Sequence, residues 1–268
     1  MVTNHSIALV LSGGGARGAY QMGVWQAMRE LGFDQHVQVI TGCSIGAING
    51  ALLTQLDWDK ALDLWEQVQP AQVFDCLQDN NTGFNQALMR DWMQHGGIRV
   101  EGLKKLLREH LDETLIRQSP IDFGLVVYNK TLRKGQSLFT QDIPEGLLVE
   151  YVIASATFPV FQPHQIGDDL YLDGGLHSIL PMDMAFAKAG TDIVIGVDVA
   201  EASRFSPQQW RWRRQYQDRL IYIRPSKILP SPMNFSEKSR RFQMELGYND
   251  AIKILQQKND LLHKASAA

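Results

Sequence analysis

The sequence predicts an α/β protein with a mostly parallel central sheet that helices cover on both faces. Two observations support this fold class. Short runs of β-branched and aliphatic residues alternate with segments of helical period, and only one hairpin interrupts the alternation. The chain has 268 residues, of which 44% are apolar, so it is long enough to bury one large core. We therefore expect a single domain over residues 1–268.

The first half of the chain alternates strands and helices. In order, we expect a strand at 6–12, a helix at 16–31, a strand at 37–41, a helix at 47–53, a helix capped by Asp57 or Asp59 that ends near Pro70, and a helix at 101–111. Gly32 is placed to end the first helix. Residues 71–100 have no clear period, so we expect short helices and loops there, which could form a lid over the site.

The second half continues this order after one hairpin. We expect hairpin strands at 121–128 and 136–140, a helix at 147–156, strands at 161–166 and 170–172, a helix at 181–189, strands at 192–199 and 220–223, and a helical tail at about 236–264. Gly247 could interrupt that tail. The chain shows no repeats, linkers or low-complexity tracts, which agrees with one domain.

Composition excludes several classes of protein. A net charge of −3 does not suggest nucleic-acid binding. Cys43 and Cys76 are predicted to be free thiols in a reducing compartment. The first apolar run, residues 7–11, is too short for a signal peptide and lacks a basic flank, and no run reaches the ~20 residues of a membrane span. We expect a soluble, cytoplasmic protein.

Gly42-Cys43-Ser44-Ile45-Gly46 is a G-x-S-x-G pentapeptide between a predicted strand and a predicted helix, which is the context of a nucleophile elbow. The turn is so tight that side chains two residues either side of the serine would meet backbone, and glycine avoids this contact. The Ser44 hydroxyl would then face the amino terminus of the next helix. The alternative is an ordinary βα turn in which Ser44 caps the helix.

The glycines of residues 13–18 allow two interpretations. Gly13-x-Gly15-x-x-Gly18 matches a dinucleotide fingerprint, but the second strand does not end in the acidic residue that would bind the ribose. The other interpretation is an oxyanion hole, in which the Gly13, Gly14 and Gly15 amides face a developing negative charge. Arg17 would then support the loop; as an alternative, it is an exposed residue of the first helical turn.

A serine nucleophile needs a base. Asp173, in Asp173-Gly174-Gly175 after a predicted strand, is the more distinctive candidate, and His177 is its rival. Raising an aspartate pKa by two to three units takes roughly 3–4 kcal/mol of desolvation, which a dry pocket can supply. Asp-Gly-Gly could also be a simple turn. The sequence has no His-Glu-x-x-His and no cysteine pair at ligand spacing, so we expect neither a metal nor a cofactor.

Three motifs together resemble the patatin-like phospholipase family: residues 13–18, residues 42–46 and residues 173–175. Ala154-Ser155-Ala156-Thr157-Phe158-Pro159 is similar to the family's Ala-Ser-x-x-x-Pro block. The motifs span residues 13 to 175, and their order and spacing are more specific than any one of them.

The resemblance implies a patatin-like three-layer α/β/α sandwich and hydrolysis of fatty acyl esters of phospholipids or lysophospholipids without a metal. It implies a Ser–Asp dyad, with Ser44 as nucleophile and Asp173 as base, beside an oxyanion hole at Gly13–Gly15 that Arg17 supports. Two alternatives remain open. One is an acyltransferase that uses the same acyl-enzyme, and the other is a non-catalytic lipid- or nucleotide-binding module.

Residues 210–216, Trp-Arg-Trp-Arg-Arg-Gln-Tyr, form a basic and aromatic run. One interpretation is a patch that contacts an anionic membrane peripherally, with its aromatic side chains at the headgroup level. The other is a solvated helix whose tryptophans pack inward. The expected partner is a lipid ester substrate, and no oligomeric state is predicted.

Overall fold

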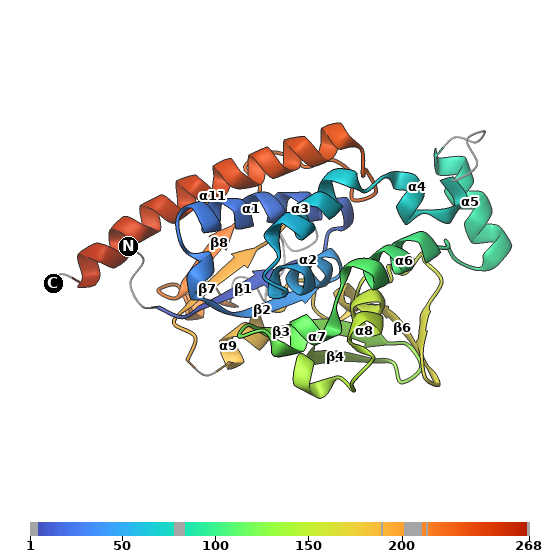
Figure 1. Cartoon of the computed structure of the whole chain (residues 1–268), viewed down its shortest axis with the longest axis horizontal. Helices are drawn as coiled ribbons and strands as arrows, with labels where there is room; N and C mark the ends of the chain where they lie inside the picture. The colour runs from blue at the N-terminus through green and yellow to red at the C-terminus, as the bar shows by residue number, and fades with distance from the viewer. Residues whose placement is uncertain (1–4, 78–83, 189, 201–210, 213, 267–268) are drawn as a thin grey trace.

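The computed structural model of the chain describes residues 5–77, 84–188, 190–200, 211–212 and 214–266, and in this part eight strands form one mixed sheet in the order β5-β6-β3-β2-β1-β7-β8, with β4 also paired to β3 (Figure 1). The strands are β1 Ile7–Leu11, β2 Val37–Cys43, β3 Asp122–Asn129, β4 Lys134–Phe139, β5 His164–Ile166, β6 Asp169–Asp173, β7 Ile193–Val197 and β8 Leu220–Ile223. Five adjacent strands, β3, β2, β1, β7 and β8, are parallel, whereas β4 and β6 pair antiparallel with β3, and β5 pairs antiparallel with β6. The predicted α/β class and the β3–β4 hairpin are confirmed.

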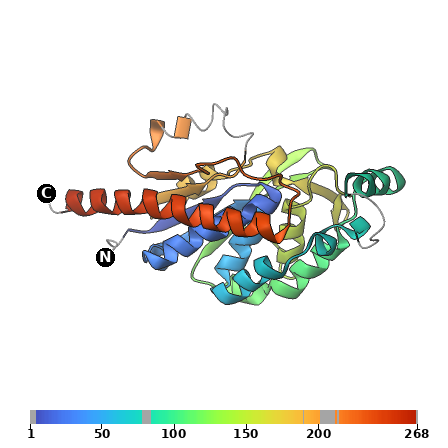
Figure 2. The ribbon, with the colours of Figure 1, turned by 90° about the horizontal axis from the view of Figure 1, so that it is seen from above.

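Helices lie on both faces of the sheet (Figures 1 and 2). They are α1 Gly18–Glu30, α2 Ile45–Thr54, α3 Trp58–Gln67, α4 Pro70–Val73, α5 Phe84–His95, α6 Glu101–His110, α7 Glu113–Gln118, α8 Leu148–Ser155, α9 Met182–Ala187 and α11 Glu237–Ser266. None of the helices in the described part of the chain combines the length and apolar character needed to cross a bilayer.

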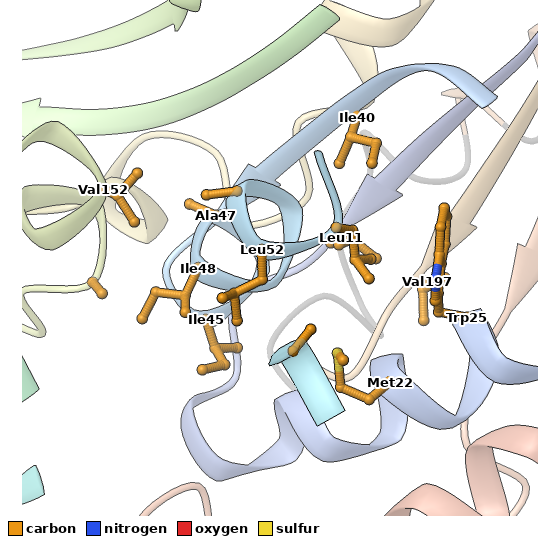
Figure 3. Close-up of a cluster of buried hydrophobic side chains, with 14 of the residues drawn as sticks. Leu11, Met22, Trp25, Ile40, Ile45, Ala47, Ile48, Leu52, Val152 and Val197 are labelled. Atoms are coloured by element: carbon orange, nitrogen blue, oxygen red, sulfur yellow. The ribbon is translucent and has the colours of Figure 1, made fainter. Parts of the chain in front are cut away.

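The alternation of side chains along β1 fills two cores. Ile7, Leu9 and Leu11 are buried in the larger core with residues of α1, α2 and α11, whereas Ala8 and Val10 are buried in the smaller core with residues of α9. Figure 3 shows part of the larger core, to which the sheet contributes Leu11 and Ile40 and α2 contributes Leu52. Because both faces are covered, the parallel strands consist almost entirely of apolar residues.

The long C-terminal helix α11 is continuous, so the predicted interruption at Gly247 is wrong. A Cβ at Gly247 would lie 2.1 Å from the Tyr20 carbonyl oxygen, and a Cβ at Gly23 would lie 1.9 Å from the Met244 carbonyl oxygen. These two glycines therefore let α1 and α11 pack backbone to backbone. The helix accepts a glycine here because close packing offsets a propensity cost of about 1 kcal/mol.

Two predicted segments differ in detail. The strand expected at 161–166 is limited to β5, and Phe161 forms an isolated bridge with Ile98 instead. Residues 71–100 contain α4 and α5, with residues 78–83 outside the described part. Val73 of α4 and the following Phe74 line the cavity described below, so part of this segment borders the site, and a lid stays a prediction.

Candidate active site

The Ser44 backbone has the strained conformation of a nucleophile elbow. Its φ of 55° and ψ of −126° lie outside the regions that L-residues normally occupy, directly between β2 and α2. A Cβ at Gly42 would lie 2.2 Å from the Gly46 carbonyl oxygen, and one at Gly46 would lie 2.2 Å from the Leu11 carbonyl oxygen. Both glycines are therefore required by close backbone contacts, and Ile45 begins α2 directly after the serine.

The register of β3 brings the elbow and Asp173 together. Strand β2 pairs with the first part of β3 and ends with Cys43 opposite Val126. At the next residue, Val127, the antiparallel strand β6 takes the place of β2 and ends with Asp173 opposite Val127. Two strands thus meet end to end beside β3, and the residues at their ends, Ser44 and Asp173, line the same cavity.

The Asp173 carboxylate is 5% exposed, and its two oxygens have different surroundings. Oδ1 accepts a hydrogen bond from the Gly175 N–H at 2.7 Å and lies 3.8 Å from the Cys43 sulfur. Oδ2 is buried and has no hydrogen-bond partner within the described part of the chain. One oxygen is therefore held in place, and the other remains available.

Burial raises the pKa of Asp173 to about 6, although the nearby Ser44 hydroxyl, the Gly175 N–H and the Cys43 thiol each lower it. The Ser44 hydroxyl is thus close enough to stabilise the carboxylate, but it does not reach hydrogen-bonding geometry with Oδ2. Hydrogen bonds between catalytic groups are often long before a substrate binds.

The glycine loop lies beside the elbow because β1 pairs with β2, with Leu11 opposite Gly42. The Gly13 N–H donates to the Ile179 carbonyl oxygen at 2.9 Å, so it is already used. No hydrogen bond from the Gly14 or Gly15 N–H is found within the residues described above. Of the three amides that the sequence singled out, Gly14 and Gly15 are therefore the ones available to a ligand.

Arg17 is buried, which excludes the alternative of an exposed residue on the first helical turn. Its Nε donates to the Pro230 carbonyl oxygen at 2.8 Å. The neighbouring Ala16 N–H donates to the Pro232 carbonyl oxygen at 2.7 Å. These bonds connect the segment before α11 to the glycine loop, and the supporting role of Arg17 stays a prediction.

Several supporting residues come from outside the three motifs. The Ser155 hydroxyl donates to the Val126 carbonyl oxygen and accepts the Ser44 N–H at 3.0 Å, so it fixes the elbow to β3. Asn49 accepts the Trp65 indole N–H at 2.8 Å and donates to Gln21 at 2.9 Å. The Ala-Ser-x-x-x-Pro block pointed to Ser155, but the sequence carried no signal for the Asn49 network.

An apolar cavity of about 650 Å³ contains both Ser44 and Asp173 in its wall. Its remaining lining is almost entirely aliphatic and aromatic and comes from α2, α3, α6, the segment after α8 and the segment before α11, including Ile48, Trp65, Leu107, Phe161 and Phe235. A cavity of this size and polarity suits one extended apolar group of a ligand.

No histidine lines this cavity in the described ranges. His177 is exposed, and its ring packs so closely on β4 that a Cβ at Gly135 would lie 2.0 Å from it. His164 is buried beside Glu150, with 2.9 Å between Nε2 and Oε2. The geometry thus favours Asp173 over His177 as the partner of Ser44. The same ranges contain no group of three His, Cys, Asp or Glu side chains arranged to hold a metal ion.

The basic and aromatic run is only partly described, because residues 201–210 and Arg213 lie outside the described residues. Trp212 is buried, and its indole N–H donates to Asp183 Oδ1 at 2.7 Å. This tryptophan therefore packs inward, as expected for a solvated helix with buried tryptophans. Tyr216 stacks on Phe186 with ring centroids 3.7 Å apart. Membrane contact by this run stays a prediction.

The fold and the site together define a class: an α/β protein with a serine on a nucleophile elbow, beside a buried carboxylate and a glycine loop. A family model described as Patatin-like phospholipase matches residues 9–186. The chain belongs to this family, and the resemblance of its motifs is confirmed.

Relatives differ greatly in length from this chain. An uncharacterized NTE family protein of Mycobacterium tuberculosis is 29% identical, over 73% of this chain and 50% of its own length. Lysophospholipase nte1 of Aspergillus terreus is 28% identical, over 94% of this chain and 15% of its own length. The chain thus spans half of the first relative and a much smaller part of the second.

Solved structures with the same fold include VipD from Legionella pneumophila, with a TM-score of 0.61 and 16% identity over 95% of this chain and 67% of that one. Human GIVD cytosolic phospholipase A2 aligns with a TM-score of 0.56 and 13% identity over 97% of this chain and 59% of that one. At such identities the similarity establishes the fold alone.

Proposed function

We propose that this chain is a serine hydrolase that cleaves a fatty acyl ester of a phospholipid or lysophospholipid. One observation carries the proposal: Ser44, in the strained elbow conformation, and Asp173, whose Oδ2 has no partner among the described residues, lie in the wall of one apolar cavity. An unpartnered buried carboxylate oxygen is costly for the fold, and a proton-accepting role gives a reason for it.

The reaction would begin with attack of Ser44 Oγ on the acyl carbonyl carbon, while Asp173 Oδ2 accepts the hydroxyl proton. The carbonyl π bond opens, and the tetrahedral intermediate carries negative charge on its oxygen. Collapse of the intermediate breaks the ester C–O bond, and Asp173 returns the proton to the departing alcohol oxygen. The acyl group is then bonded to Ser44.

Negative charge on the intermediate would be stabilised by the Gly14 and Gly15 N–H groups, which have no other acceptor in the described residues. The positive end of the α2 dipole, immediately after Ser44, adds to this effect. Each oxyanion donor is worth on the order of 10²–10³ in rate. Water would then attack the acyl carbonyl carbon while Asp173 accepts a proton from it. Collapse of this second intermediate breaks the bond between the acyl carbon and Ser44 Oγ, Asp173 returns the proton to Ser44 Oγ, and the fatty acid is released.

A fatty acyl ester is favoured over a more polar ester because the cavity offers few polar groups beyond the glycine loop, Ser44 and Asp173. Burial of each methylene group stabilises binding by about 0.8 kcal/mol. The name lysophospholipase of the Aspergillus terreus relative supports the same substrate class.

The proposal is tested by incubating the protein with phosphatidylcholine and with lysophosphatidylcholine and measuring free fatty acid, together with labelling by a fluorophosphonate probe. We expect fatty acid release and one labelled peptide, which contains Ser44. Transfer of the acyl group to an added alcohol in preference to water would identify an acyltransferase. Absence of both labelling and turnover would indicate a binding module.

The pH dependence of kcat/KM reports the ionisation of the base. Because Asp173 acts in its ionised form and burial raises its pKa to about 6, activity should rise with pH through an apparent pKa near 6. The Cys43 thiol, whose own pKa burial raises further, stays protonated and stabilises the ionised form of Asp173. Cys43→Ala should therefore shift the acid limb to higher pH and keep most activity on the alkaline plateau.

The matched control is Cys76→Ala, because Cys76 is the other free cysteine and lies outside the cavity. We expect this variant to leave the acid limb in place. An acid limb that does not move in Cys43→Ala would contradict the proposed contact between the thiol and Asp173 Oδ1.

A further inference from the structure

Helix α5 exposes large apolar side chains on its outer face, although Ala87, Leu88 and Asp91 lie on its inner face. Met89, Trp92 and Met93 follow the i, i+3, i+4 spacing of one helical face, yet they are 60%, 48% and 68% exposed. Single exposed apolar side chains are common on protein surfaces, but three large ones on one face of a helix are an apolar patch.

On its inner side, α5 forms a buried ion pair with the segment that follows it. Asp91 is 3% exposed, and its carboxylate receives the Arg99 guanidinium at 2.7 Å and the Arg99 backbone N–H at 2.8 Å. His95 Nδ1 lies 3.1 Å from the same carboxylate. This ion pair and the packing of Ala87 and Leu88 attach the inner side of α5 to the protein, whereas Met89, Trp92 and Met93 remain exposed.

The segment that follows α5 is hydrogen-bonded to a segment that lines the cavity. Beyond α5, the Ile98 N–H donates to the Val160 carbonyl oxygen at 2.9 Å, and the Gln162 N–H donates to the Ile98 carbonyl oxygen at 3.1 Å. The bridged segment exposes Phe158 and Val160, and Phe158 also lines the cavity. Leu176, on the opposite side of Asp173 in sequence, is 52% exposed and lines the cavity too.

We call the six side chains Met89, Trp92, Met93, Phe158, Val160 and Leu176 the apolar rim. Figures 1 and 2 both place α5 at one end of the molecule, beyond α4 and α6, with the C-terminal end of α11 at the other. The C-terminal end of α11 therefore lies far from α5, and the six rim side chains are exposed within the described part of the chain.

We propose that the apolar rim docks the protein on a lipid surface, so that an acyl chain passes from the lipid into the cavity without crossing water. The inference depends on the proposed function, because it assumes that the substrate carries a fatty acyl chain. Rim and cavity share Phe158 and Leu176, and this continuity favours lipid over a protein partner.

The composition of the rim agrees with a lipid partner. Tryptophan and phenylalanine are the residues that amphipathic surface helices insert at the boundary between headgroups and acyl chains. Arg90, next to Met89 on α5, is exposed and has no acidic partner in the described part of the chain, so it can meet an anionic headgroup.

The test is binding to phosphatidylcholine vesicles that contain a minor fraction of phosphatidylglycerol, measured by co-sedimentation. All variants carry Ser44→Ala, so binding is read without turnover, and a failure of the proposed function does not affect the result. The triple variant Met89→Gln, Trp92→Gln, Met93→Gln should bind at least about tenfold more weakly, because three inserted apolar side chains are lost. The single variant Met93→Gln should show a smaller loss in the same direction.

A matched triple control replaces three exposed apolar residues outside the rim, Leu56, Leu115 and Phe242, by glutamine. It should bind vesicles as the parent does. Equal binding by the rim triple and the parent would overturn the proposal. A parent that is dimeric in solution together with a rim triple that is monomeric would also overturn it, because the rim would then be a protein interface. With Ser44 intact, the rim triple should keep its rate on a water-soluble short-chain ester and lose rate on vesicles.

Discussion

Replacing Ser44 by alanine should abolish ester hydrolysis, with a fall in kcat on the order of 10⁵-fold or more, because removal of a serine nucleophile has effects of that size in serine hydrolases. The fold should survive. Alanine keeps the Cβ that lies against Gly13 and leaves the Ser44 N–H to Ser155 hydrogen bond in place. Initial rates on lysophosphatidylcholine and the melting temperature measure the two effects.

A serine without a role in the cavity provides the control for this variant. Ser226 is exposed and lies outside the cavity wall, so Ser226→Ala should keep full activity and full labelling by a fluorophosphonate. Substantial hydrolysis by Ser44→Ala, or a probe attached to another serine in the wild type, would contradict the assignment of the nucleophile.

Asp173→Asn is expected to produce an inactive but more stable protein. The amide has nearly the shape of the carboxylate and can still accept the Gly175 N–H, but it cannot accept the Ser44 proton. Loss of a general base costs about 10²–10⁴ in rate. The kcat/KM on the same lysophospholipid measures this loss.

The stability gain follows from the raised pKa. A folded-state pKa of about 6 against a model value of 3.8 means that the folded protein holds this proton more tightly than the unfolded chain. The wild type therefore loses stability as pH rises through about 6, by up to about 3 kcal/mol at 1.36 kcal/mol per unit. Asparagine does not titrate, so the stability advantage of the variant should grow between about pH 4 and about pH 6 and level off above about pH 7 in denaturant unfolding.

Two comparisons test the choice of base. Asp168→Asn changes an exposed aspartate and should alter neither activity nor the pH dependence of unfolding. His177→Ala should keep most activity, because this histidine lies outside the cavity. Near-total loss of activity in His177→Ala, with activity retained in Asp173→Asn, would make the histidine the base.

The elbow and the hairpin were predictable because local rules decide them. Gly42 and Gly46 are required by backbone contacts within a few residues of Ser44 or with the neighbouring strand β1. A G-x-S-x-G string after a strand is therefore enough to predict the elbow. The parallel order of β1 and β2 follows in the same way from alternating strands and helices.

Contacts over long separations decided the details of the site. Cys43 meets Asp173 across 130 residues, and Ser155 meets Ser44 across 111 residues. The sequence placed Gly13 in the oxyanion hole with its neighbours, but the Ile179 carbonyl occupies its N–H. Which hydrogen bond a loop amide makes depends on the chain that folds back onto it, and no local pattern encodes that.

Sequence patterns alone were enough to predict the family, the α/β class and the two side chains, Ser44 and Asp173, on which the proposed chemistry rests. The three-dimensional arrangement was needed to see which carboxylate oxygen lacks a partner in the described residues, where the apolar cavity lies and that α5 exposes Met89, Trp92 and Met93. Motifs report backbone geometry over only a few residues. Burial and hydrogen-bond partners, in contrast, arise when distant segments close around the same space.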